Sequence, residues 1–326
     1  MNDYQDLFNL INDYQVITIY RHQRPDGDAV GSQLGLKKFI LDNFKDKEVY
    51  ALGIDTYDRY PFVDHVEDEK VKESLAIVLD TANAERISDE RFNSAKEIVK
   101  IDHHIIVDQY GKYNYVNPSA AATAELLVDI LTSDAFQKTT ISKEAATYLY
   151  SGILTDTLSF KTSNTTSNTL RAASILALAG IDIYDINEHL FSTTYGDFEF
   201  CTYLRSKMML EDGLAYAILD HQDLEKYHIS SSKARAFISD LNGVEDFKIW
   251  VVFTQNDEGT YDVSLRSKKA FKINEIAQKY HGGGHANACG IKGLNVYTLN
   301  DLLKDLKQLI SYWIMNNYKY NNMSES

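Results

Sequence analysis

The sequence predicts an α/β protein of two domains, in which a doubly wound, mainly parallel sheet is followed by a smaller mixed α/β domain across a cleft. Apolar runs typical of buried strands end near residues 20, 79 and 101 and alternate with segments of helical periodicity. The 326 residues also exceed the roughly 100 to 200 residues of one typical domain. We expect the first domain over 1–190, a helical linker over 191–212, the second domain over 213–316 and a disordered tail over 317–326.

The composition narrows the class of partner. Lys and Arg number 33 against 47 Asp and Glu, a net charge of −14 that argues against binding long duplex nucleic acid through its phosphates. Short anionic substrates stay compatible with this charge, provided that a local basic patch exists. Two widely separated cysteines favour neither a disulfide framework nor a Cys-rich zinc site, and no apolar stretch approaches the roughly 18 residues of a membrane span. We predict a cytoplasmic protein without membrane contact; its oligomeric state stays open, with a homodimer as one alternative.

The first strand is expected at residues 16–20, a run of β-branched and apolar residues. The loop after it carries His22, Asp26 and Asp28, and Asp28 is expected to cap a helix over about 29–40. Asp26-Gly27-Asp28 can also be explained as a turn followed by an N-cap. His22 on the same loop favours a ligand-binding interpretation.

The next three apolar runs predict strands at 49–52, 75–79 and 97–101. Asp80 follows the second of these, and Asp102, His103 and His104 follow the third. Each has an alternative explanation, because Asp80 can cap a helix and a histidine beside an acid is often simply solvated. Since ligands in open parallel sheets bind at the carboxyl ends of the strands, we expect these side chains to converge with the loop after residue 20.

Two helices are expected after the sheet, over 123–131 and from about 143 to an end within 154–157. Asp156 lies near the C-terminus of the second helix, where an acid opposes the helix dipole, so a cation such as a metal ion is expected to compensate it. A surface aspartate is the alternative. Asn168 is expected to cap a further helix over 169–179, which Gly180 closes.

The second domain is expected to contain strands over 213–219, 247–253 and 261–265 and helices over 230–241, 271–280 and 302–314. Arg266 and the run Gly282-Gly283-Gly284-His285 supply a basic patch. A run of glycines lets backbone N–H groups approach an anion as a nest, and Arg266 offers a bidentate fork. A flexible glycine loop is the alternative.

The candidate ligands near one sheet edge are His22, Asp26, Asp28, Asp80, His103 and Asp156. Four carboxylates and two imidazoles suit two hard divalent ions and favour Mn²⁺ over Ca²⁺, and the lack of thiolates argues against structural zinc. A pair of such ions lowers the pKa of a bridging water and binds a phosphoryl oxygen. Phosphoester hydrolysis is therefore the predicted reaction.

In order along the chain, His22-x3-Asp26-x-Asp28, Asp80, Asp102-His103-His104 and Asp156 resemble the motifs of the DHH phosphoesterase superfamily. The second domain resembles DHHA1, with Arg266, Gly282, Gly283, Gly284 and His285 as its substrate-binding residues. The resemblance implies one metal ion on His22, Asp26 and Asp80. It implies a second ion on Asp28, Asp80, His103 and Asp156, so that Asp80 bridges. His104 is then expected to contact the substrate phosphate or protonate the leaving oxygen, with Asp102 orienting it.

Within the superfamily, the two-domain layout is similar to members that hydrolyse short oligoribonucleotides to mononucleotides and remove the 3′-phosphate of 3′-phosphoadenosine 5′-phosphate. We therefore expect an exonuclease-type phosphodiesterase and phosphatase that uses two divalent ions, Mn²⁺ first and Mg²⁺ or Co²⁺ as alternatives. Its partners would be short RNA and small phosphorylated nucleotides. A cyclic or linear dinucleotide phosphodiesterase, an inorganic pyrophosphatase and a non-catalytic nucleotide-binding protein remain alternatives.

Overall fold

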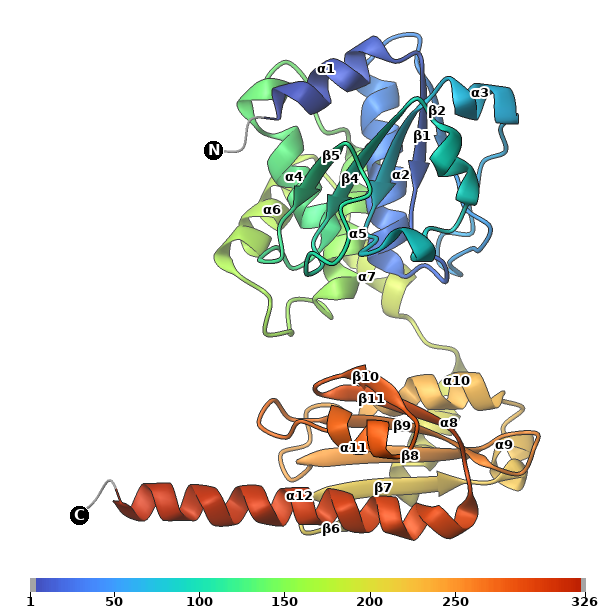
Figure 1. The fold of residues 1–326 in the computed structure, drawn as a ribbon, viewed down its shortest axis with the longest axis vertical. Coiled ribbons are helices and arrows are strands. Elements are labelled where there is room, and N and C mark those ends of the chain that lie inside the picture. Colours follow the sequence, from blue (N-terminus) through green and yellow to red (C-terminus); the bar gives the residue numbers. More distant parts are fainter. Residues whose placement is uncertain (1–3, 324–326) are drawn as a thin grey trace. The chain divides into compact units, whose positions relative to one another are not determined.

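The computed structural model describes residues 4–323 and divides the chain into two compact units, Met1–Ser192 and Thr193–Ser326 (Figure 1). The α/β class is confirmed: the first unit contains a parallel sheet and the second a mixed one. Within the described part of the chain, no helix has both the length and the apolar character needed to cross a membrane.

The first unit is built around a five-stranded parallel sheet of order β2-β1-β3-β4-β5. Its strands are β1 (Val16–Tyr20), β2 (Glu48–Ala51), β3 (Leu75–Leu79), β4 (Glu97–Asp102) and β5 (Tyr113–Val116). Its helices are α1 (Gln5–Asp13), α2 (Gly27–Asn43), α3 (Asp68–Lys72), α4 (Thr123–Leu131), α5 (Lys143–Asp156), α6 (Ser167–Leu178) and α7 (Ile183–Phe191), and the 3-10 turns include Ala84–Arg86, Glu90–Ser94 and Asp134–Phe136.

Both faces of this sheet are covered, which is why the central strand β3 is apolar throughout. In β3, Leu75, Ile77 and Leu79 pack into the core formed with α2, α4 and α5, whereas Ala76 and Val78 pack with residues of α3 and the following 3-10 turn on the opposite face. β2 lies on one side of β1, and β3 lies on the other side, so the order of strands along the chain switches direction between β1 and β3. The carboxyl ends of these two strands therefore border the crevice where doubly wound sheets bind ligands.

Helices α2 and α5 lie antiparallel with their backbones in close contact. A Cβ atom on Gly31 would lie 2.6 Å from the carbonyl oxygen of Tyr148 and 2.8 Å from the amide nitrogen of Gly152. Gly27 and Gly35, one turn to either side on the same face of α2, are equally enclosed by α5 side chains. This packing holds the first turn of α2 beside the last turn of α5.

Two helix starts differ from the sequence-based expectation. The N-cap of α2 is Asp26, not Asp28, because its Oδ1 accepts hydrogen bonds from the amides of Asp28 (3.1 Å) and Ala29 (3.0 Å). The Asp28 carboxylate is engaged instead by α4. Helix α6 is capped by Thr166, not Asn168, since Thr166 and Thr169 form a reciprocal capping box.

The second unit contains a six-stranded sheet of order β10-β11-β9-β8-β7-β6, in which only the β7–β8 pair is parallel among the described strands. Its strands are β6 (Met209–Glu211), β7 (Leu214–Leu219), β8 (Ile249–Gln255), β9 (Tyr261–Ser267), β10 (Gly283–His285) and β11 (Ala288–Leu294). Its helices are α8 (Tyr195–Lys207), α9 (His221–Lys226), α10 (Ser231–Ala236), α11 (Asn274–Lys279) and α12 (Val296–Met323), and Phe237–Leu241 forms a 3-10 turn.

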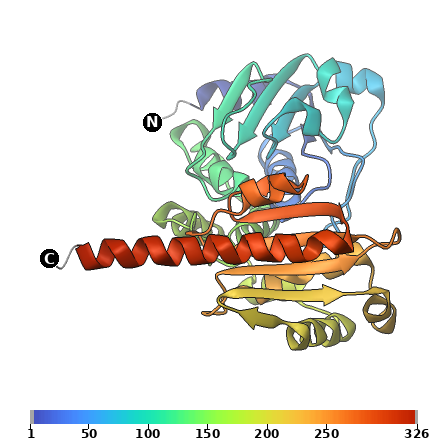
Figure 2. The same cartoon turned by 60° about the horizontal axis from the view of Figure 1, so that its bottom comes forward.

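Helix α12 lies across one face of this sheet, where Leu302 and Leu306 are buried (Figure 2). Helices α8 and α10 cover the other face. The long helix continues to Met323, past residue 317, where a disordered tail was expected, because an established helix gains a hydrogen bond with each added residue at no further nucleation cost. Residues 324–326 of the expected tail lie outside the described residues.

Candidate metal centre

The ligand-bearing residues come from the carboxyl ends of three neighbouring strands. His22 follows β1, Asp80 follows β3, and His103 and His104 follow β4. Asp80 adopts a left-handed backbone with φ of 51°, an uncommon conformation for a residue with a side chain, and its amide donates to the carbonyl of Ile101 at 3.1 Å. This local strain turns the chain at the end of β3 and is a frequent feature of functional sites.

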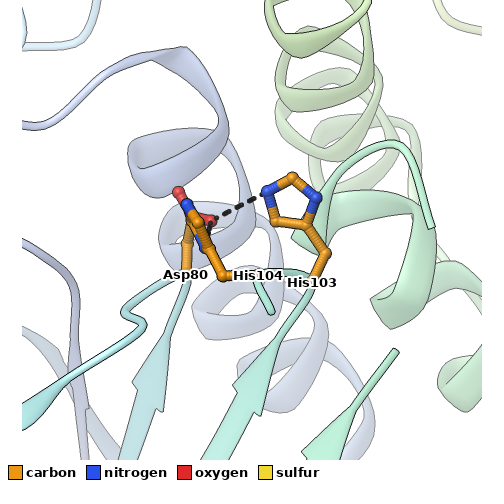
Figure 3. A group of neighbouring side chains, drawn as sticks. All are labelled: Asp80, His103 and His104. Atoms are coloured by element: carbon orange, nitrogen blue, oxygen red, sulfur yellow. Dashed lines mark ion pairs between the residues drawn. The ribbon is translucent and has the colours of Figure 1, made fainter. Parts of the chain in front are cut away.

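Asp80 is the centre of the cluster (Figure 3). Its Oδ2 lies 3.5 Å from Nε2 of His22, and its Oδ1 lies 3.4 Å from Nε2 of His103 and 3.6 Å from Nδ1 of His104. The Thr123 hydroxyl donates to the same Oδ1 at 3.1 Å. Burial alone would raise the pKa of Asp80, yet the imidazoles around it lower that pKa below its usual value. Each oxygen of this carboxylate thus faces a different set of nitrogen ligands.

The potential ligand atoms form groups that share members. One group contains His22, Asp26 and Asp80, and a second contains Asp28, His103 and Asp156, with the atoms of each group within 4.8 Å of one another. These are the sets expected for the two ions, apart from Asp80 in the second set, which still faces His103. A third group contains Asp80 and both histidines after β4. His104 was expected only to contact the substrate phosphate or protonate the leaving oxygen, yet it lies within the distance of a potential ligand.

The ligands are held in place by the surrounding backbone. His22 donates through Nδ1 to the carbonyl of Gln23 (2.9 Å), and His103 donates through Nδ1 to the carbonyl of Ala120 (3.3 Å), which leaves both Nε2 atoms facing the carboxylates. The fully buried Asp28 accepts hydrogen bonds from the amides of Thr123 (2.6 Å) and Ala124 (3.0 Å) at the start of α4. The site is therefore preorganised.

The pKa shifts of the acidic and imidazole groups indicate that the cluster lacks compensating cations. Burial, followed by the charges of Asp80 and Asp156, raises the pKa of Asp28 well above its usual value. Burial and then Asp80 and Asp26 raise the pKa of Asp156 to about 7. Burial lowers the pKa of His103, but its acidic neighbours outweigh this effect and raise it to about 10. Without cations the cluster holds extra protons, so these oxygen and imidazole donors fit divalent metal ions.

His104 is oriented by a buried ion pair that the sequence did not reveal. Its Nδ1 donates to Oδ1 of Asp102 at 2.8 Å, and Nζ of Lys100 lies 3.3 Å from the other oxygen of that carboxylate. Lys100 also donates to the carbonyls of Ala82 (2.8 Å) and Asp108 (2.9 Å). The available signal was a lysine between two apolar strand residues, Val99 and Ile101. Because Nδ1 is engaged, Nε2 is the nitrogen of His104 free to act on a substrate.

The second unit brings its two candidate side chains into one cross-strand row. Arg266 of β9 pairs with Ala288 of β11, which pairs with His285 of β10, so both side chains lie on the same face of the sheet. In place of an open nest, the glycine run forms a tight hairpin. A Cβ on Gly282 would lie 2.4 Å from the carbonyl oxygen of Gly290, and one on Gly284 would lie 2.3 Å from that of Ala288. Gly282 and Gly284 are thus required by packing, whereas a Cβ on Gly283 would meet no atom within 4 Å.

A doubly wound sheet that gathers histidine and aspartate side chains around one shared carboxylate defines a class of protein whose donors fit divalent metal ions. The chain belongs to the DHH family: the model of the DHH family, N-terminal domain, matches residues 16–153, and that of the DHHA1 domain matches residues 212–312.

Two of its curated relatives are similar over nearly their whole length. The probable bifunctional oligoribonuclease and PAP phosphatase NrnA of Streptococcus mutans is 33% identical, with 95% of this chain and 100% of that protein covered. The bifunctional oligoribonuclease and PAP phosphatase NrnA of Bacillus subtilis is 32% identical over 93% and 97% of the two chains. The crystal structure of an exopolyphosphatase-related protein from Bacteroides fragilis shares the fold, with a TM-score of 0.81, 24% identity and coverage of 95% and 96%.

Proposed function

We propose that this chain is a metal-dependent phosphoesterase that hydrolyses short oligoribonucleotides to mononucleotides and removes the 3′-phosphate of 3′-phosphoadenosine 5′-phosphate. The observation that supports this proposal most directly is the position of Asp80, because one of its carboxylate oxygens faces His22 and the other faces His103. The names of the relatives at 33% and 32% identity supply the substrate classes.

Two divalent ions fit the ligands. His22, Asp26 and Asp80 would hold one ion, and Asp28, Asp80, His103 and Asp156 the other. We infer Mn²⁺ as the ion, with Mg²⁺ and Co²⁺ as alternatives, because carboxylate and imidazole donors suit it. When bound, such a pair supplies an activated water and charge stabilisation for phosphoryl oxygens.

The remaining chemistry belongs to the protein's own side chains. Asp102 fixes the orientation of His104 through Nδ1, so Nε2 can contact the substrate phosphate or deliver a proton to the leaving oxygen. The His104 side chain is 36% exposed, which gives a substrate access to it. Lys100 keeps the buried Asp102 carboxylate paired with a cation.

The second unit is proposed to select substrates. The row of Arg266 and His285 can bind a phosphate or base of a short oligonucleotide, with the guanidinium as a bidentate donor. The net charge of −14 means that the surface as a whole repels a long strand, so affinity should not grow with each added nucleotide. Dinucleotides to about pentanucleotides should therefore be preferred, and a cytoplasmic location remains the prediction.

A substrate panel with Mn²⁺ tests the proposal. It compares dinucleotides, a 24-mer RNA, 3′-phosphoadenosine 5′-phosphate, cyclic dinucleotides and pyrophosphate at equal concentrations. We expect the dinucleotides and 3′-phosphoadenosine 5′-phosphate to be hydrolysed fastest. Faster turnover of the 24-mer, of cyclic dinucleotides or of pyrophosphate would replace the proposed activity with a processive nuclease, a cyclic-dinucleotide phosphodiesterase or a pyrophosphatase.

A further inference from the structure

An open cavity of about 570 Å³ lies beside the loop that carries His22 and Asp26 of the first group of ligands. It is lined by Arg24 and Pro25, which lie between His22 and Asp26 in the chain, and by residues 54–58 of the loop after β2. The volume lies in the range of small-molecule sites, which is roughly 300 to 1,000 Å³. The Asp26 side chain is 58% exposed, so the ligand group is open to solvent at this residue.

The two walls of the cavity are tied together by a buried arginine. Arg21 is fully buried, and its guanidinium donates to the side-chain oxygen of Gln33 (3.0 Å) and to the carbonyl of Asp55. The Asp55 carboxylate in turn accepts a hydrogen bond from the amide of Arg24 at 2.8 Å. Arg24 has a left-handed backbone with φ of 51°, which this hydrogen bond helps to maintain. The cavity is thus held in shape before any ligand arrives.

The far end of the lining loop is anchored on α5. Tyr60 is buried, its hydroxyl lies 2.9 Å from that of Ser151, and its amide donates to the carbonyl of Tyr57 at 2.9 Å. Tyr57 is therefore held at a fixed place in the lining. Burial raises the pKa of the Tyr57 phenol, while the charge of Arg59 lowers it and that of Asp26 raises it.

The lining offers surfaces and a hydrogen-bond acceptor for a planar, amino-bearing group. Asp58 contributes a carboxylate to the lining, whereas the Asp55 carboxylate is already held by the amide of Arg24, with the Arg21 guanidinium on the backbone carbonyl of the same residue. Tyr57, which is half-buried and packs partly against the core of the first unit, offers an aromatic ring, and the 74% exposed Ile54 offers an apolar surface. Both are surfaces on which a nucleobase can stack. The Asp58 carboxylate can accept a hydrogen bond from an exocyclic amino group.

We propose that this cavity is a nucleobase subsite, which holds the base of a nucleotide at the metal centre and favours bases with an exocyclic amino group. Adenine, cytosine and guanine each present such a donor, whereas uracil presents carbonyl oxygens in its place and would face the carboxylates unfavourably. The proposal rests on the proposed function, because it assumes a nucleotide substrate, and it adds a base preference that the metal centre alone does not provide.

The test compares kcat/KM with Mn²⁺ for 5′-phosphorylated diadenylate, dicytidylate, diguanylate and diuridylate. We expect the wild-type protein to disfavour diuridylate. Tyr57→Ala should lower kcat/KM for all four substrates by about tenfold, mainly through KM, since one stacking contact is lost. Asp58→Asn should reduce the difference between diadenylate and diuridylate. Mn²⁺ affinity, measured by calorimetry, should stay at the wild-type value in both variants.

Matched controls are Tyr184→Ala, an exposed tyrosine of α7, and Asp134→Asn, an exposed aspartate of a 3-10 turn, neither of which lines the cavity. Both should behave as wild type. Equilibrium binding of adenosine and uridine monophosphates separates the two proposals. If wild type cleaves no dinucleotide, the proposed function fails, yet tighter binding of the adenosine nucleotide that Tyr57→Ala weakens still supports the subsite. Unchanged kcat/KM values and unchanged nucleotide binding in both cavity variants would overturn it.

Discussion

Replacing Gly31 with alanine should disturb the metal centre without touching a ligand. The new Cβ would lie 2.6 Å from the carbonyl oxygen of Tyr148 and 2.8 Å from the amide nitrogen of Gly152. Ordinary contacts between such atoms begin near roughly 3.5 Å. Because both obstacles are backbone atoms of α5, the two helices must separate by about 1 Å to restore a normal contact.

This separation has two measurable consequences. Overpacking costs about 1 to 3 kcal/mol, of which the better helix propensity of alanine returns about 1 kcal/mol, so we expect a net loss of up to about 2 kcal/mol. Asp28 lies on α2 and Asp156 at the end of α5, and a displacement of about 1 Å exceeds the roughly 0.5 Å that a preorganised site tolerates. Mn²⁺ affinity should therefore fall by about tenfold or more.

Urea unfolding and titration calorimetry with Mn²⁺ measure the two effects in the same samples. Gly196→Ala is the matched control, because it also adds a methyl group inside a helix, but the nearest atom to its Cβ is Thr194 Oγ1 at 4.0 Å. The control should bind Mn²⁺ as wild type does. The reasoning is refuted if Gly31→Ala binds Mn²⁺ with wild-type affinity while the protein remains folded.

Three further changes address the residues around the metal centre and the second unit. His104→Ala should retain its metal ions yet lower kcat by about 10²-fold or more; a wild-type kcat at every pH would remove His104 from the mechanism. Lys100→Met leaves the buried Asp102 carboxylate without its cation, so urea unfolding should show a loss of about 3 to 5 kcal/mol, and a loss below about 1 kcal/mol would contradict the buried pair. Arg266→Ala and His285→Ala should each reduce kcat/KM on dinucleotides while calorimetry shows intact Mn²⁺ binding, and loss of the metal in these variants would show that the second unit does more than select substrates.

The strands that carry the ligands could be predicted from sequence because their signal is local. β1 and β3 begin and end at the expected residues, since runs of apolar and β-branched side chains stop where polar loop residues begin. β5 was not expected, because its residues are only half-buried at the sheet edge. The β10–β11 hairpin was also missed. Its glycines have no side chains to show an alternating pattern, and the role of Gly282 and Gly284 is close backbone packing.

The features that could not be predicted depend on contacts between distant segments. The burial of Lys100 beside Asp102 follows from the way β4 is covered, and its place between two apolar residues, the only local signal, does not show which group the lysine pairs with. Likewise, Asp26 and Asp28 are both plausible N-caps in the sequence. The choice between them is made by Thr123 and Ala124, nearly one hundred residues later, whose amides bind the Asp28 carboxylate. The close approach of α2 and α5 at Gly31 has the same origin.

The shared role of Asp80 is tested most directly by the metal content and turnover of Asp80→Asn. Asparagine tolerates the left-handed backbone at this position and keeps the shape of the side chain, so the fold should survive while one negative charge is lost. If Asp80 serves both ions, elemental analysis after dialysis should show fewer than two Mn²⁺ per chain, and dinucleotide hydrolysis should fall by about 10²-fold or more. Two retained ions together with turnover near that of wild type would contradict a site organised around this carboxylate.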